Sequence, residues 1–130
     1  MSKEGLEIIF DAMASLGLKY QFMQYVCKKG EKLPDTYFVG EYQEIEPMYE
    51  DGMQESIFLI TGFSREKWDA LENAKEKISS YFNKVGGKTV ITASGAAVAV
   101  FYSNSLVVPT GDAELKKIQI NLDVKEWSVN

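Results

Sequence analysis

Apolar side chains recur along this chain with two periodicities, one typical of helices and the other of strands. Near the N-terminus the spacing is helical, with apolar residues at Leu6, Ile9, Phe10, Met13 and Leu16. This spacing predicts an amphipathic helix over residues 3–16. Ser2 is the expected N-cap and Gly17 the expected C-cap, because a Ser hydroxyl accepts from the first free backbone N–H groups and Gly adopts the left-handed terminal conformation.

A second helical pattern follows in the middle of the chain and is the most regular of the sequence. Its apolar positions are Trp68, Leu71, Ala74, Ile78, Tyr81 and Phe82. Intervals of three and four residues predict a helix over residues 65–83. We expect Ser64 to cap its N-terminus, and the pair Gly86-Gly87 to follow its end.

The remaining segments alternate with the period of two that indicates strands. The expected strands are residues 19–26, 37–46, 53–63, 88–95, 96–103 and 118–125, with turn-rich connections at 27–35 and 103–112. The dipeptide Asp51-Gly52 predicts a tight turn that joins 37–46 and 53–63 into a long hairpin. Within 53–63, apolar residues face both ways, which predicts cover on both faces towards the end of that strand.

The order of these elements is α-βββ-α-βββ, or the same order with one strand fewer. Hairpins dominate the connections, so we expect an α+β fold with a mostly antiparallel or mixed sheet and two helices packed on one face. We find no internal repeat, linker or boundary, and we expect a single domain over residues 1–130.

Charge changes this picture, because it is distributed unevenly. Residues 33–64 contain no Lys or Arg and carry seven acids: Asp35, Glu41, Glu44, Glu46, Glu50, Asp51 and Glu55. The whole chain has a net charge of −5, so this window accounts for −7 and the rest for +2. From residue 83 to residue 111 there is no acid, while Lys84 and Lys88 are present. A polarised surface of this kind is typical of a protein that meets other proteins.

Composition excludes several classes. A chain that is 45% hydrophobic and 25% charged is an ordinary globular one. Its pI near 4.8 argues against recognition of nucleic acid. The longest apolar stretch, 96–101, is too short to span a membrane, and the N-terminus does not resemble a signal peptide. The lone Cys27 allows no intrachain disulfide, which fits a reducing cytoplasm.

We expect no catalytic, cofactor or metal site. The chain has no histidine, which removes Ser–His and Cys–His pairs. Ser94 in TASGAA lacks the glycine two residues before it that a nucleophile elbow needs. The segment KVGGK, residues 84–88, lacks the spacing of a phosphate loop. The acids of the 37–63 hairpin could form a carboxylate pair or a calcium loop, but a solvated or subunit-facing strand explains them better.

The order of elements resembles that of the tail terminator, or tail completion, proteins of long-tailed bacteriophages and prophages. The segments that carry the resemblance are PDTYFVGEYQEIEP, the acidic turn YEDGMQ, ESIFLITGFS and the helix KWDALENAKEKISSYF, all between Pro34 and Phe82. The resemblance implies a curved sheet with two helices and a structural role in the virion. It implies a homo-oligomeric ring, usually a hexamer, that binds the end of the tail tube, stops its polymerisation and presents a docking surface for the head.

The implied partners are other copies of the chain, the tail tube protein and the head-completion or connector protein, with assembly in the bacterial host cytoplasm. The expected interface residues are Glu41, Glu44, Glu46, Glu50, Asp51, Glu55, Lys84 and Lys88. An acidic edge that meets a less acidic edge of the next subunit would close a head-to-tail ring. Two alternatives stay open: another head-tail joining or minor tail protein, and a small α+β ligand-binding domain outside phages.

Overall fold

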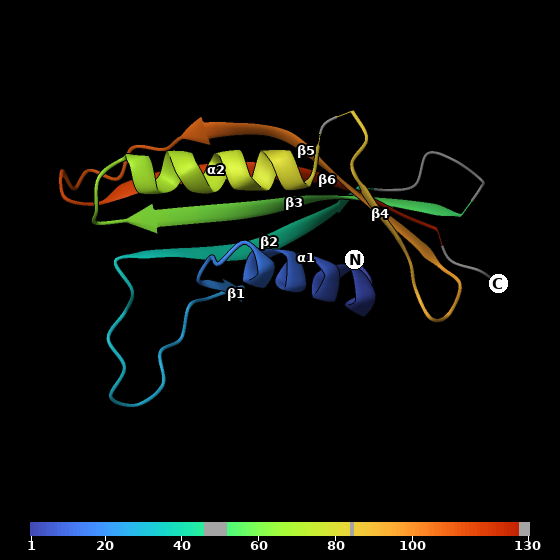
Figure 1. Ribbon diagram of the computed structural model, residues 1–130, viewed down its shortest axis with the longest axis horizontal. Helices are drawn as coiled ribbons and strands as arrows, with labels where there is room; N and C mark the ends of the chain where they lie inside the picture. The colour runs from blue at the N-terminus through green and yellow to red at the C-terminus, as the bar shows by residue number, and fades with distance from the viewer. Residues whose placement is uncertain (46–51, 84, 128–130) are drawn as a thin grey trace.

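The computed structural model describes residues 1–45, 52–83 and 85–127. Their elements follow the order α-βββ-α-βββ, as the sequence predicts (Figure 1). They are α1 (Lys3–Ser15), β1 (Tyr20–Phe22), β2 (Thr36–Ile45), β3 (Met53–Ser64), α2 (Asp69–Tyr81), β4 (Lys88–Ile91), β5 (Ala97–Val107) and β6 (Lys116–Trp127).

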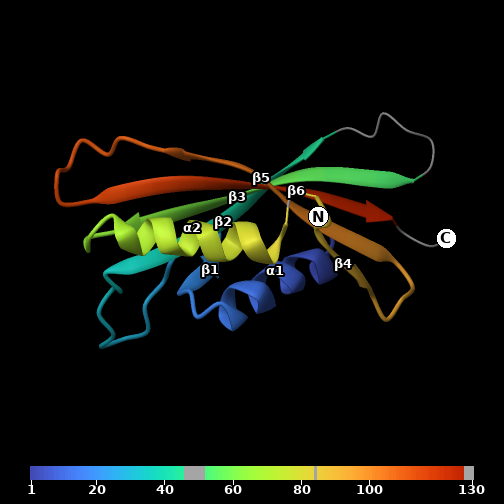
Figure 2. The same ribbon diagram turned by 45° about the horizontal axis from the view of Figure 1, so that its top comes forward.

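The strands form one curled sheet in the order β1-β2-β3-β6-β5-β4. Every neighbouring pair is antiparallel except β1 and β2, which run parallel. Both helices lie on the same side of the sheet, so the molecule has two layers (Figure 2). The fold is therefore α+β, with a mostly antiparallel sheet and two helices on one face, as expected from the sequence.

The core lies between the helices and the face of the sheet that they cover, which we call the inner face. Strand alternation places every second side chain of β3 and β6 on this face, including Phe58, Ile60, Ile120 and Leu122, all of them fully buried. The helices contribute Ile9, Ala12, Met13, Leu71, Ala74 and Ile78. The opposite, outer face has no helix over it in the described chain. On this face of β3, Ile57 is 36% exposed, whereas Leu59 and Phe63 nearer the strand end are half-buried, so the cover on both faces expected towards the end of residues 53–63 is only partial.

The N-terminal helix is capped as predicted. Ser2 Oγ accepts a hydrogen bond from the Gly5 N–H at 3.0 Å. Gly17 has φ +74°, the left-handed conformation that ends a helix. The Ser2 cap is itself fixed by Glu126 of β6, whose carboxylate accepts from the Ser2 backbone N–H at 3.1 Å and from the Ser2 hydroxyl. The start of α1 is thus attached to the sheet by a residue far along the chain.

The second helix begins later than predicted. Ser64 is the last residue of β3, buried and paired with Thr36 of β2 by their hydroxyl groups at 2.8 Å, so its role as the N-cap of the helix is a wrong prediction. Trp68 takes the N-cap position, where its side chain makes no capping hydrogen bond and its indole N–H instead donates to Glu72 Oε1 of the helix at 3.0 Å. Long-range strand pairing outweighs the local capping signal here, because pairing with both β2 and β6 holds Ser64 extended.

Three strands also end at clearly different residues from those that the alternation predicts. β1 ends at Phe22, because Met23 has φ +70° and turns the chain away from the sheet. β4 ends at Ile91, where the turn to β5 begins. β5 continues through the segment expected to be a loop and ends at Val107, with a bulge between Tyr102 and Asn104 that keeps it paired with β6.

Candidate interaction surface

The short outer strands leave both edges of the sheet partly open. β1 pairs only with residues 38–40 of β2, so within the described chain residues 41–45 pair on one side alone, with β3. At the other edge, β4 has β5 as its one described neighbour. The start of β3 and the β4–β5 hairpin extend beyond the helices at one end of the molecule (Figure 1). The expected interface acids and lysines that the structure describes lie on or beside these two edges.

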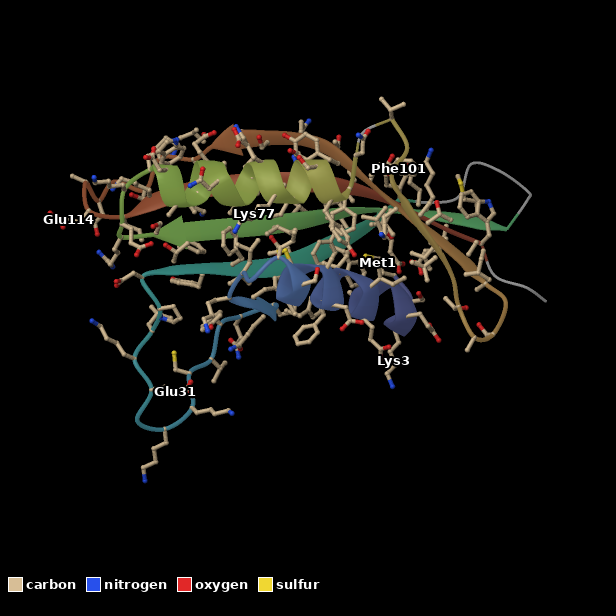
Figure 3. All side chains as sticks on the ribbon, viewed as in Figure 1. Met1, Lys3, Glu31, Lys77, Phe101 and Glu114 are labelled. Carbon is tan, nitrogen blue, oxygen red and sulfur yellow. The ribbon has the colours of Figure 1, made fainter. Side chains whose placement is uncertain are left out.

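Two of the predicted acids, Glu41 and Glu44, are exposed on the open part of β2. Their positions in the register place Glu41 on the outer face and Glu44 on the inner face. Glu44 forms an ion pair with the N-terminal ammonium of Met1, although its side chain remains 52% exposed. Met1 itself is folded against the sheet (Figure 3). A cation from outside the Lys- and Arg-free window 33–64 thus reaches Glu44.

Glu55 is half-buried on the outer face of β3, opposite Lys125 of β6. Its pKa is raised from the ordinary value of 4.5, first because burial disfavours the charged form and then because of hydrogen bonding to, and repulsion from, Asp123. Lys125 acts in the opposite direction and lowers the Glu55 pKa. Asp123 Oδ1 is buried and has no hydrogen-bond partner among the described residues. Glu55 is thus one of two adjacent, partly buried carboxyl groups on the outer face rather than a freely solvated acid.

Lys88 is exposed on β4, at the opposite edge from Glu41 and Glu44. Its Nζ lies 4.9 Å from the centre of the Tyr81 ring, a cation–π geometry that holds the charge near the end of α2. The other four predicted interface residues, Glu46, Glu50, Asp51 and Lys84, lie outside the described residues. The described part of the set therefore consists of two acids on the β2 edge, Glu55 within the outer sheet face and Lys88 on β4.

An aromatic hollow on the outer face was missed by sequence reasoning. The Tyr37 ring stacks on the Phe63 ring with their centres 5.2 Å apart, and the Tyr25 ring is tilted against Tyr37 with their centres 5.1 Å apart. Lys117 Nζ lies 5.4 Å from the Phe63 ring centre. These side chains line a hollow of about 400 Å³ at the base of the long β1–β2 connection, which projects from the body of the molecule (Figure 1). Tyr37 and Phe63 are directly paired across β2 and β3. A two-residue turn at Asp51-Gly52 would instead place Tyr37 opposite Glu66, so the expected hairpin turn gave no signal for this pair.

A smaller hollow of about 200 Å³ lies on the inner face beside Met1, Gln54 and Val98. In the described part of the chain, no group of three or more His, Cys, Asp or Glu side chains is arranged to hold a metal ion. No described helix is long and apolar enough to cross a membrane.

Comparison with known proteins supports the fold and nothing finer. No protein-family model matches the chain, and no curated protein matches it. Among the solved structures that match, one superimposes with a TM-score of 0.64 and 15% sequence identity, over 100% of this chain and 99% of the other. At this identity the likeness concerns the fold alone. The chain therefore shares a complete two-layer α+β architecture with a solved protein of nearly equal length.

Proposed function

We propose that this chain is a structural protein of a bacteriophage or prophage that forms a ring on the end of the tail tube. The ring stops tube polymerisation and presents a docking surface for the head. In this role the protein acts through geometry and stoichiometry and catalyses no reaction. Its partners are copies of itself, most simply six in a ring, the tail tube protein and a head-completion or connector protein.

The observation that carries the proposal is the asymmetry of the two-layer fold. Both helices cover one face, while in the described chain the other face and parts of both sheet edges are uncovered. In β6, at the middle of the sheet, the polar residues Gln119 and Asn121 lie on the open face, while the residues that alternate with them are buried on the inner face. A protein that must contact neighbours on two sides and a tube on a third needs such free surfaces.

The element order adds to this support. A capped N-terminal helix, a short strand, the long β2–β3 hairpin, a helix and three further strands follow one another as in the tail terminators that the sequence resembles. The exposed acids Glu41 and Glu44 also lie on the edge opposite Lys88, an arrangement suited to head-to-tail association.

Deletion of the gene in its phage or prophage tests the proposal. Without the ring, the surface that receives the next tube subunit stays exposed, so we expect intact capsids together with tails of abnormal length that fail to join heads. Electron microscopy of induced particles measures this directly. Normal-length tails attached to filled heads would reject the function. Complementation with the intact gene is the control, and it must restore uniform tails.

A further inference from the structure

The open part of β2 has backbone groups that no described residue satisfies. The Phe38 N–H donates to the Lys19 carbonyl, and the Gly40 carbonyl accepts from the Met23 N–H at 2.8 Å. The even-numbered residues of β2 therefore direct their backbone groups towards the β1 side. Since this direction alternates along a strand, Tyr42 and Glu44 present their N–H and C=O groups to the same side, where β1 no longer runs.

The free side of β4 is arranged in the same way. The Thr92 N–H donates to the Ala96 carbonyl where β4 turns into β5. Alternation then directs the backbone of Val90 towards β5 and that of Thr89 and Ile91 outwards. Each edge thus offers two residues, spaced by two, whose backbone donors and acceptors have no partner in the described chain. Such an edge is a template for a strand of another chain.

Charge selects which edges can meet. Pairing of β2 with β2 of another copy would bring Glu41 and Glu44 against their own equivalents, and pairing of β4 with β4 would bring two Lys88 side chains together. Pairing of β4 with β2 instead places Lys88 beside acids. Lys88 lies across from buried Val100 and Glu44 across from buried Ser56, so both side chains belong to the inner face and would meet on it in a continued sheet.

We propose that a second copy of this chain adds its β4 to residues 41–45 of β2, and that the sheet continues from one subunit into the next. Four antiparallel pairings separate β2 from β4, so the two strands point the same way within one subunit. If the subunits keep one orientation, the new pairing is parallel. The exposed Ile91 of β4 then packs on the outer face, beside residues such as Gln43.

The pairing is heterologous, because each subunit uses two different edges and every open chain of subunits keeps one free β2 and one free β4. Closure into a ring removes both free edges. The closed ring rests on the proposed function, whereas the strand pairing rests on the edges and charges described above. The two can therefore fail separately.

The backbone part of the pairing is tested with Thr89→Pro. Proline removes the outward N–H of β4 and leaves the β4–β5 ladder intact, since residue 89 does not donate into it. We expect at least a tenfold rise in the dissociation constant of self-association, measured by analytical ultracentrifugation over a range of concentrations. Thr89→Ala, which keeps the N–H, is the matched control and should associate like the wild type. Circular dichroism checks that each monomer stays folded.

The charge part is tested with Lys88→Glu, which should weaken self-association about tenfold. Salt should weaken the association of the wild type but no longer that of this variant. Adding Glu44→Lys to that variant should restore association. Lys77→Glu makes the same charge change on an exposed position of α2, away from both edges, and should have no effect. Association that is equally strong in Lys88→Glu and the wild type contradicts the pairing.

Cross-linking decides which edges meet. In a Cys27→Ser background, one variant carries Glu44→Cys and another Lys88→Cys. A short thiol cross-linker should give covalent dimers when the two are mixed and none with either variant alone. Dimers from one variant alone indicate a two-fold contact and overturn the proposal, as does a mixture that yields none. A failed cross-link with abnormal tails in the deletion strain rejects the strand pairing only; a successful cross-link with normal tails rejects the proposed function only.

Discussion

The two faces of the sheet are built from the same strands but differ in what covers them. On the inner face, Phe58 and Ile60 are fully buried beneath the helices. On the outer face, the next residues of the same strand, Ile57 and Leu59, are exposed or half-buried. The inner face is therefore specified by packing within the chain. The outer face is compatible with the fold but leaves apolar surface exposed to solvent. Burial of such surface by a partner would contribute most to the free energy of binding.

The largest expected difference between the faces comes from removing a leucine on each side. Leu71 of α2 is fully buried against the inner face, so Leu71→Ala should lower the free energy of unfolding by about 2–5 kcal/mol. Leu59→Ala on the outer face should cost about 1 kcal/mol or less, because that side chain is already partly solvated. Urea unfolding of dilute protein measures both. Equal costs would mean that the outer face is covered in solution.

A smaller difference is expected from adding a methyl group. A Cβ at Gly62 would lie 2.6 Å from the Phe38 ring on the inner face, so Gly62→Ala must displace that ring or the strand. The expected loss is about 1–3 kcal/mol. The neighbouring Thr61→Ala, on the outer face, removes atoms without crowding any, and should change stability by about 0.5 kcal/mol. If Gly62→Ala is equally mild, the inner face is less tightly packed than its burial indicates.

The contrast between the faces also explains which features could be read from the sequence. The α1 cap, the helix core positions Leu71, Ala74 and Ile78 and the alternation of β6 depend on spacing within one element, and these predictions are confirmed. The inner face follows from them, because helix stripes and strand alternation must bury the same side chains.

The failures arose where a distant segment decides the outcome. The local sequence predicts Ser64 as a helix cap, but its hydrogen bond to Thr36 and its pairing with β6 hold it in β3. The sequence predicts Glu55 as one of several solvated acids. Its pKa is instead influenced by Asp123 and Lys125, which are distant in the sequence, so no local pattern connects them to Glu55. The open edge of β2 could not be predicted either, because β1 ends at Phe22, where the positive φ of Met23 turns the chain away although the side-chain alternation continues.

The smallest effect concerns Glu55 and sharpens the description of the outer face. Because burial and Asp123 raise its pKa in the folded state, the protonated form is favoured by folding. The contribution of Glu55 to stability is therefore greatest at pH values below its unfolded pKa and declines as the pH rises through its folded pKa. Glu55→Gln should thus be more stable than the wild type near neutral pH, and this advantage should shrink on acidification. Urea unfolding from about pH 4 to pH 7 measures the difference.

In an Asp123→Asn background the pH dependence should be weaker, because one of its causes is gone. An advantage of Glu55→Gln that is constant across this range would show that the outer-face carboxyl is solvated like an ordinary surface acid.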